Sequence, residues 1–450
     1  MKTILITAPS SNTGKTLITL GLIRALKNRR LDVSPFKTGP DFIDTKYLEL
    51  AGGKRAGNLD LHMLGEEGIR AALSMNPGDY GVIEGAMGYF DGIYNSFENS
   101  SYDICKRLGI NSILVYRPQG EMFSAIPKIK GMVDFPNSNI KGVILNRVRR
   151  DIYLLLKEKI EEYVEIKVLG YVEEDKDLEI DSRHLGLIQP MENRNGQIII
   201  DKIASKIEET VDIDGLIHIM KDIVVEEYQY PKKRNIKVAI AYDEAFSFYY
   251  NENLQLLENT CQVEYFSPLR DREVPKCDLL YLGGGYPELY KKGLSQNTTM
   301  LDSIRNMAEA GGYIYGEGGG FMYLVEDIEG FPMVGILKGR ASMKDKVQRF
   351  GYVNIHLLKD TLLGKRGDCL RGKEFRRSSI KIGDRASYDI KKPKGSLSWQ
   401  CGFTYKNVLA AYPHINFLGN MKAFNYLLDR IENKDKEENH VYKKSNGNRE

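Results

Sequence analysis

The N-terminal region restricts the fold of this 450-residue chain more than any other part of its sequence. An apolar run at 3–7 leads into the loop PSSNTGKT at 9–16, and a Leu/Ile-rich stretch follows at 15–29. The loop keeps the Gly-Lys-Thr end of the P-loop pattern GxxxxGK[ST], although Pro9 takes the place of the first glycine. A strand, this loop and a helix in succession predict an α/β domain with a phosphate-binding site where the helix begins.

The residue types in this loop are those that bind nucleotide phosphates and magnesium. Backbone N–H groups at the start of the helix point toward phosphate oxygens, and the helix dipole favours an anion there. Lys15 can reach the β- and γ-phosphates, and the Thr16 hydroxyl can bind Mg²⁺. The sequence therefore predicts ATP and Mg²⁺ as cofactors. The expected ATP-binding residues are Ser10, Ser11, Asn12, Thr13, Gly14, Lys15, Thr16 and Asn146.

Apolar runs alternate with helix-compatible stretches through the first half of the chain. Such alternation predicts a parallel sheet with helices on both faces, and continuously apolar runs are typical of strands buried on both sides. The expected strands lie at 3–7, 32–36, 80–84, 112–116, 141–145 and 168–172, and expected helices lie at 15–29 and 151–164.

A polar segment, EEYQYPKKRN at 226–235, separates this series from a second one. We predict an ATP-binding synthetase domain at 1–225, a linker at 226–236 and a second α/β domain at 237–430. The residues at 431–450 are highly charged and predict a frayed tail. In the second domain the expected strands are 237–242, 277–282 and 313–316, and the expected helices are 253–259 and 300–310.

Carboxylates follow the ends of two expected strands. Asp41 and Asp44 come after the second strand, Glu84 ends the third, and Asp91 follows in GYFDG. Ligands of open α/β sheets bind at the carboxyl ends of the strands. We therefore expect these four carboxylates to act with Lys15 at the catalytic site. Asp41 and Glu84 are the expected metal ligands beside Thr16.

Composition and charge exclude several classes of protein. Lys plus Arg number 64 and Asp plus Glu number 61, so a net charge of +3 gives no argument for binding nucleic acid or an anionic membrane. No apolar run approaches the roughly 18–20 residues of a membrane-spanning helix. The five cysteines are scattered without a CxxC pair, which is typical of reduced thiols. We expect a cytoplasmic protein that acts on small molecules.

Short motifs in both halves of the chain carry a resemblance to a known family. The motifs of the first half are FKTGPDFIDTKY (36–47), NLDLHML (58–64), EGAMGYFDG (84–92), GVILNRV (142–148) and RHLGL (183–187). Those of the second half are AYDEAFSFYYNENLQLLE (241–258), YLGGGYPELY (281–290) and GEGGGFMYL (316–324). Together they resemble the cobyrinic acid a,c-diamide synthases, a group that includes the nickel-sirohydrochlorin a,c-diamide synthases.

The resemblance implies two coupled sites. An N-terminal P-loop domain, similar to dethiobiotin synthetase, would use ATP to phosphorylate side-chain carboxylates of a tetrapyrrole. A C-terminal domain similar to class I glutamine amidotransferases would release ammonia, which displaces phosphate to give an amide. The four carboxylates named above match family positions associated with metal, ATP or the activated carboxylate, and their individual roles stay open.

The chain departs from the family pattern at the glutaminase nucleophile. The family has a cysteine on a strand-to-helix elbow, in a pattern like AECGGLMYL, whereas this chain has Gly318 there. Glycine suits the backbone of such an elbow but cannot form a thioester. His414 matches the catalytic histidine, while Asn416 stands where a second histidine is usual, and Ser247 replaces a frequent cysteine without any elbow. We expect Gly318 and His414 to be the remnant of an inactive glutaminase site.

Two further departures change the charge of the chain. Arg117 stands where the family usually has the aspartate of an Asp-Ala pair. The segment KEFRRS at 373–378 replaces HEFHYS, so Lys373, Arg376 and Arg377 either meet substrate carboxylates or belong to a solvated loop. These changes are typical of a diverged paralogue.

Two hypotheses follow from these motifs and departures. The first is an ATP-dependent amidoligase for a tetrapyrrole polycarboxylate that takes free ammonia, ammonia from a separate glutaminase or a different amine. The second is a non-catalytic paralogue that binds nucleotide or tetrapyrrole and regulates or scaffolds a true synthase. The number of amidations and a homodimeric state are left open.

Overall fold

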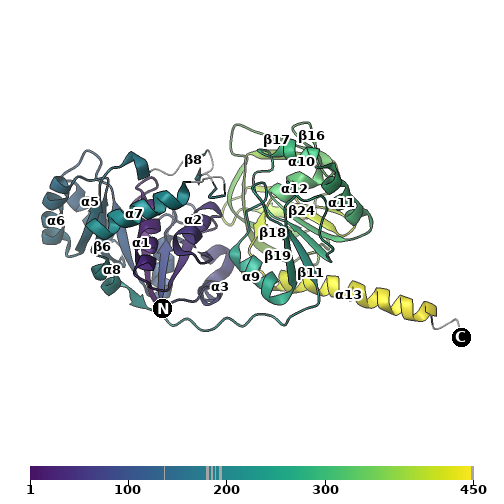
Figure 1. Cartoon of the computed structure of the whole chain (residues 1–450), viewed down its shortest axis with the longest axis horizontal. Coiled ribbons are helices and arrows are strands. Elements are labelled where there is room, and N and C mark those ends of the chain that lie inside the picture. The colour runs from purple at the N-terminus through teal and green to yellow at the C-terminus, as the bar shows by residue number, and fades with distance from the viewer. Residues whose placement is uncertain (136, 179–181, 184–185, 188, 192–194, 447–450) are drawn as a thin grey trace. The chain divides into compact units, whose positions relative to one another are not determined.

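The computed structural model describes residues 1–446, except 136, 179–181, 184–185, 188 and 192–194. Part of the RHLGL motif and the last four residues of the expected tail lie outside the described residues. The chain divides into two units, Met1–Tyr228 and Gln229–Glu450, each with its own sheet and core (Figure 1). The division falls within the segment 226–236 for which the sequence predicts a linker.

The N-terminal unit is built on one eight-stranded sheet. Its strands are β1 Lys2–Thr7, β2 Val33–Thr38, β3 Gly57–Leu59, β4 Tyr80–Glu84, β5 Asn111–Tyr116, β6 Ile140–Asn146, β7 Lys167–Val172 and β10 Lys221–Asp222. Their order is β3-β2-β4-β1-β5-β6-β7, and β10 pairs antiparallel with β1. All other pairs in this sheet are parallel, which confirms the predicted α/β class. A short hairpin, β8 Ser182–Arg183 and β9 Gly186–Leu187, lies outside it.

Helices connect consecutive strands of this sheet. They are α1 Lys15–Asn28, α2 Ile43–Gly52, α3 Leu61–Met75, α4 Ser101–Leu108, α5 Ala125–Asp134, α6 Arg150–Val164, α7 Gly196–Thr210 and α8 Ile213–Ile219, with a short 3₁₀ turn at Lys176–Leu178. Helices α1, α2 and α7 lie side by side (Figure 1). Arg24 of α1 holds the three together, because its guanidinium donates to carbonyls of α2 and pairs with Asp201 of α7.

The order of the strands decides where the phosphate loop lies. β1 occupies the middle of the sheet, between β4 and β5, and the loop follows its carboxyl end. Because the neighbouring strands are parallel, the residues that follow β2, β4, β5 and β6 reach the same edge. Side chains from five separate stretches of sequence therefore meet around one loop.

The C-terminal unit has a six-stranded sheet of its own. Its strands are β11 Lys237–Ala241, β12 Gln262–Phe266, β13 Leu279–Leu282, β14 Tyr313–Glu317, β23 Phe403–Tyr405 and β24 Val408–Ala411. The order is β12-β11-β13-β14-β24-β23, parallel except for the β23–β24 pair. Its helices are α9 Asn251–Thr260, α10 Lys291–Gln296, α11 Thr298–Glu309, α12 Gly319–Leu324 and α13 Met421–Asn446, with a 3₁₀ turn at Phe417–Gly419.

Two smaller sheets complete this unit, and the sequence did not predict them. One has four strands, β15 Val325–Ile328, β16 Phe331–Pro332, β17 Leu337–Met343 and β20 Ser378–Ile382. The other has five strands, β18 Arg349–Leu357, β19 Cys369–Arg376, β21 Tyr388–Lys391, β22 Ser398–Cys401 and β25 His414–Ile415. In the second sheet His414 of β25 pairs with Lys373 of β19, so this sheet fixes the backbone of His414.

The C-terminal end of the chain differs from the expected frayed tail. Helix α13 begins at Met421 and continues through the charged segment to Asn446. A charged composition disfavours burial but does not disfavour a helix, because Glu and Lys are good helix formers. Among the described residues, no helix is both long and apolar enough to cross a lipid bilayer.

We expect trypsin to cut the native protein first at Lys232 or Lys233. Both are exposed, and the backbone at 223–234 belongs to no helix or strand. Arg234 is a poorer site, because its guanidinium pairs with Asp429 and Glu432. Limited digestion followed by mass spectrometry should give two stable fragments that divide in this segment. First cuts within either unit, with this segment left intact, would contradict the domain boundaries that we predict.

Candidate functional site

The phosphate loop is held in a shape that only glycine permits at Gly14. This residue adopts the left-handed conformation with φ of 87°, and helix α1 begins directly after it. A Cβ at Gly14 would lie 2.0 Å from Nδ2 of Asn146, which donates a hydrogen bond of 2.7 Å to the Thr13 carbonyl. Asn146 at the end of β6 thus buttresses the loop, and any larger residue at Gly14 would displace it.

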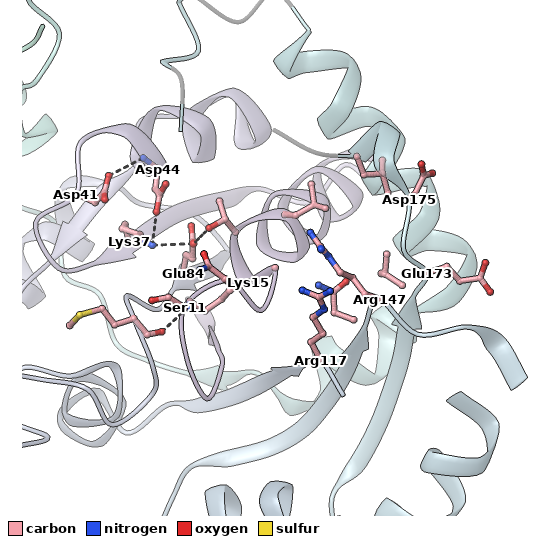
Figure 2. Close-up of a pocket in the computed structure, with 18 residues that line it drawn as sticks. Ser11, Lys15, Lys37, Asp41, Asp44, Glu84, Arg117, Arg147, Glu173 and Asp175 are labelled. Atoms are coloured by element: carbon pink, nitrogen blue, oxygen red, sulfur yellow. Dashed lines mark hydrogen bonds and ion pairs between the residues drawn. The ribbon is translucent and has the colours of Figure 1, made fainter. Parts of the chain in front are cut away.

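A cavity of about 680 Å³ lies over this loop at the carboxyl edge of the sheet (Figure 2). The structure brings nine of the predicted site residues to its walls or floor: Ser11, Asn12, Gly14, Lys15, Thr16, Asp41, Asp44, Glu84 and Asn146. Arg117, which the sequence analysis noted only as a departure from the family pattern, lines it as well. The predicted residues Ser10, Thr13 and Asp91 are not among the described residues that line it. The cavity therefore joins the loop to three of the four expected carboxylates.

The side chain of Lys15 lines the cavity. Its Nζ donates a hydrogen bond of 2.6 Å to the carbonyl of Met87, in the loop that follows β4. Burial, together with the positive charge of Lys37, lowers the pKa of Lys15 to about 8. An anion such as a nucleotide phosphate would restore the pKa, since an opposite charge nearby favours the protonated form.

Lys37 is a functional candidate that the sequence analysis missed. It ends in the cavity from strand β2, and its Nζ lies 2.9 Å from Asp44 and 3.0 Å from Glu84 (Figure 2). Burial alone would lower its pKa, but the carboxylates of Asp44, Glu84 and Asp41 outweigh that effect and raise it. The two neighbouring carboxylates therefore favour the charged ammonium form of Lys37, which bridges them. Burial raises the pKa of Asp44 to about 7, against the lowering effect of Lys37.

Glu84 and Thr16 have the arrangement that a magnesium ion beside ATP requires. The Thr16 hydroxyl donates a 2.5 Å hydrogen bond to Oε1 of Glu84, so the two oxygens are adjacent. Oε2 of Glu84 is buried and has no hydrogen-bond partner among the described residues. An orphaned buried carboxylate oxygen is costly and indicates an absent partner. Hard oxygen ligands suit Mg²⁺, which is bound through one or two protein groups together with substrate phosphates.

Asp41, the third expected metal ligand, and Asp91, an expected catalytic carboxylate, both accept backbone hydrogen bonds. Asp41 lines the cavity, but its Oδ1 accepts hydrogen bonds from the N–H groups of Ile43 and Asp44 at the start of α2. Asp91 is exposed, and its Oδ2 accepts the N–H of Gly88 at 3.0 Å. No group of three or more His, Cys, Asp and Glu side chains that could hold a metal alone occurs among the described residues. The residues therefore fit a metal that arrives with a nucleotide.

Two arginines form the opposite wall of the cavity. Arg117 follows β5 and Arg147 follows β6, and their guanidinium groups lie together in Figure 2. Each has an NH group near the same oxygen of Glu174, at 3.6 Å for Arg117 and 3.4 Å for Arg147. The positive charge of Arg117, unexpected at this position, therefore faces the cavity. Glu173 and Asp175 line the same wall and partly offset the two arginines.

The C-terminal unit contains a sharp elbow between β14 and α12. Gly318 at the turn has φ of 50° and ψ of −104°, a conformation that residues with a Cβ adopt only under strain. Its N–H donates a 2.9 Å hydrogen bond to the Ala411 carbonyl. A strand, a strained turn and a helix in this order are typical of a nucleophile elbow. The elbow expected from the sequence is thus present around a residue that has no side chain.

The imidazole of His414 lies directly against the elbow. A Cβ built on Gly318 would approach its Nε2 to 2.6 Å, and a Cβ on Gly284 would approach its Cε1 to 2.3 Å. The ring therefore occupies the space into which a side chain at 318 would project. Its Nδ1 is 3.5 Å from Oε2 of Glu317, which is 1% exposed. Glu317 is fixed in turn by the hydroxyls of Tyr281 and Tyr315, at 2.9 and 2.6 Å.

The other departures in this unit have structural roles. Nε of Arg376 donates to Glu374 at 2.6 Å, and the guanidinium stacks on Tyr412 at 4.1 Å from the ring centroid. The segment at 373–378 is therefore part of strands β19 and β20, and the expectation of a solvated loop is wrong. Asn416 is buried and donates to Glu252 at 3.1 Å. Ser247 is buried, and its backbone N–H donates to the Gly284 carbonyl.

The chain matches known families along nearly all of its length. Residues 4–188 match the family described as the CobQ/CobB/MinD/ParA nucleotide binding domain. Residues 237–422 match the CobB/CobQ-like glutamine amidotransferase domain. These two matches coincide with the two units and assign a nucleotide-binding role to the first.

Curated relatives align with both units together. The chain is 41% identical over 436 residues to the cobyrinate a,c-diamide synthase of Clostridium acetobutylicum, covering 95% of this chain and 100% of the relative. The corresponding protein of Clostridium tetani is 38% identical over 441 residues, with 96% and 100% covered. That of Methanocaldococcus jannaschii is 37% identical over 439 residues, with 93% and 97% covered. The chain therefore belongs to the cobyrinate a,c-diamide synthase family, as its sequence motifs predict.

Proposed function

We propose that this protein amidates side-chain carboxylates of a tetrapyrrole with ATP, Mg²⁺ and ammonia, and that it does not generate ammonia from glutamine by itself. The proposed ATP-dependent amidation is supported chiefly by four charged side chains around the phosphate loop, those of Lys15, Lys37, Asp44 and Glu84. The second part is supported by Gly318, which lacks the sulfur that a thioester requires. The family relationship supplies the substrate class, because the relatives are named as cobyrinate a,c-diamide synthases.

The reaction needs an activated carboxylate, because a free carboxylate is a poor electrophile and oxide is a poor leaving group. The carboxylate oxygen attacks the γ-phosphorus of ATP, the bond to ADP breaks, and an acyl phosphate forms. Ammonia then attacks the acyl carbon, inorganic phosphate leaves, and the amide remains. Mg²⁺ held by Thr16 and Glu84 would supply positive charge to the phosphates during the transfer.

The residues of the chain supply orientation and charge for this transfer. Backbone N–H groups at the start of α1 would hold the phosphates. Lys15 would exchange its hydrogen bond with the Met87 carbonyl for contacts with the transferring phosphoryl group, whose negative charge it stabilises. Lys37 lies beside Asp44 and Glu84, where its positive charge can stabilise negative charge on the phosphoryl acceptor.

An assay with purified components tests the proposal. The chain is incubated with cobyrinic acid, Mg-ATP and an ammonium salt, and mass spectrometry follows the replacement of hydroxyl by amino groups. We expect amides to form together with ADP and phosphate, and none without ATP. Binding of ATP and cobyrinic acid without any turnover would instead support the non-catalytic paralogue.

A further inference from the structure

The loop between β4 and α4, residues 85–100, exposes large apolar side chains beside the ATP cavity. Met87 is 47% exposed, Tyr94 is 61% exposed and Phe97 is 53% exposed. Phe135, at the end of α5, is 62% exposed. We call these four residues the aromatic ridge. An apolar surface of this kind in a soluble protein marks a binding site more often than chance.

Two residues of the ridge, Phe97 and Phe135, are held in place by a packed aromatic cluster. Phe97 contacts Tyr102 with ring centroids 5.6 Å apart, Tyr102 contacts Phe90 at 5.1 Å, and Phe90 contacts Phe135 at 5.5 Å. Tyr102 is 1% exposed and anchors the cluster in the core. Side chains that are ordered before a ligand arrives lose less entropy on binding.

The backbone of the loop is also fixed, and part of it is strained. The N–H of Tyr89 donates to the carbonyl of Ala8, directly before the phosphate loop, and the side chain of Asn99 accepts the N–H of Leu61. Met87, Tyr94 and Asn99 have positive φ of 50°, 57° and 63°. A left-handed conformation is uncommon for a large side chain, and such strain concentrates at ligand-binding sites. At Tyr94 this conformation accompanies a side chain that is 61% exposed.

One residue of the ridge, Met87, reaches the cavity of the phosphate loop. Met87 belongs to both, since it lines the cavity and its carbonyl accepts the hydrogen bond from Lys15. The same loop begins at Glu84, the expected metal ligand. A substrate that presents one carboxylate to Lys15 would therefore place the rest of its body over this loop.

We propose that the aromatic ridge binds the flat apolar face of the tetrapyrrole substrate while one rim carboxylate enters the cavity. This inference rests on the proposed function for the identity of the substrate class. A macrocycle has the two properties that the surface requires, an apolar face for aromatic contact and carboxylates at its edge. A second copy of the protein bound at Met87 would cover the cavity that the substrate carboxylate must enter. We therefore propose the tetrapyrrole, and not a second copy, as the ligand of the ridge.

The decisive test compares substrate kinetics of ridge variants with a matched control. Tyr94→Ala with Phe97→Ala removes two exposed rings, and Tyr163→Ala removes a ring of similar exposure, 49%, from α6. With cobyrinic acid, Mg-ATP and ammonium, we expect the KM for cobyrinic acid to rise about tenfold or more in the double variant, because each ring contributes apolar contact. We expect kcat, the Kd for ATP and the melting temperature to change little, and Tyr163→Ala to behave like the wild type. An unchanged KM in the double variant would overturn the proposal.

A binding measurement separates this inference from the proposed function. If the wild type shows no turnover, cobyrinic acid is titrated by absorbance into the chain with a non-hydrolysable Mg-ATP analogue. Binding by the wild type that is lost in the double variant would support the ridge while refuting catalysis. Absence of tetrapyrrole binding in a wild type that still binds nucleotide would refute the ridge. Analytical ultracentrifugation of the wild type and the double variant completes the test. A dimeric wild type and a monomeric double variant would identify the ridge as a contact between copies and overturn the proposal.

Discussion

Replacement of Lys15 by alanine is expected to reduce ATP-dependent amidation by at least about 100-fold, the loss seen when one charge-stabilising donor is removed from a transition state. Lys15 is 7% exposed, and its Nζ is held by the Met87 carbonyl at the edge of the phosphate cavity. The other cations of the cavity already face carboxylates, Lys37 those of Asp44 and Glu84 and the two arginines that of Glu174, so we expect them to compensate poorly for the lost charge. Calorimetry should also show weaker binding of Mg-ATP, because Lys15 is expected to contact the phosphates already in the bound ground state and not only in the transition state.

The control for this variant is a lysine outside the cavity. Lys54 is partly exposed and pairs with Asp32 at the surface of the same unit, so Lys54→Ala should leave both ATP affinity and turnover unchanged. The melting temperature of Lys15→Ala should stay close to that of the wild type, because removing a buried ammonium also removes its desolvation cost. Equal ATP affinity in Lys15→Ala and wild type would show that the loop at 9–16 does not bind the nucleotide as proposed.

Glutamine is expected to support no amidation by the wild-type chain, while ammonium salts do. Glutaminase chemistry of this type needs a thiolate on the elbow that is activated by a histidine, and position 318 carries only a hydrogen. Loss of the nucleophile in comparable triads lowers kcat by at least about 1,000-fold. Glutamate release from glutamine, measured with an enzyme-coupled assay, should therefore not exceed the background of a protein-free control.

Gly318→Cys tests whether only the nucleophile was lost. The new Cβ would approach Nε2 of His414 to 2.6 Å, so the imidazole must first move aside. The positive φ of 50° adds strain of about 1–3 kcal/mol, and we expect a lower melting temperature than in the wild type. Gly318→Ala is the matched variant, because it brings the same Cβ and strain without a thiol.

We expect Gly318→Cys to release measurable glutamate and Gly318→Ala to release none. Inactivity of a folded Gly318→Cys would point to wider loss in the site, with Asn416, held by Glu252, as the first position to examine. Turnover of glutamine by pure wild-type protein would refute the predicted loss of the glutaminase reaction.

The parallel sheets were predictable from sequence because their strands are buried on both faces. Residues 80–84 read as a short apolar run, and β4 has these bounds in the structure. The strands at 325–405 were missed because they are only half buried and carry many charges. In β18, for example, the buried Val353, Ile355 and Leu357 alternate with the partly exposed Tyr352, Asn354 and His356, and only three apolar residues of this half-buried pattern distinguish the strand from a polar loop.

The candidate site was predictable where one local motif defines it. The loop at 9–16 has a fixed spacing, and its strand and helix follow directly in sequence. Lys37 has no such signal, since its role depends on Asp44 from α2 and Glu84 from β4, which only the fold brings to it. Arg147 was missed for the same reason, and it shares Glu174 with Arg117 although the two follow different strands.

The central position of β1 has a consequence for how the protein forms during synthesis. β1 precedes its partner strands in the chain, which are β4, β5 and finally β10, whose Asp222 pairs with Lys2. Contacts between residues so distant in the chain form slowly, because a long loop must close before they are made. The apolar segment at 3–7 therefore stays unpaired while the rest of the domain is translated. Exposed apolar segments of this kind are prone to aggregate. The nucleotide site therefore becomes complete only after the strands that flank β1 have been translated and paired.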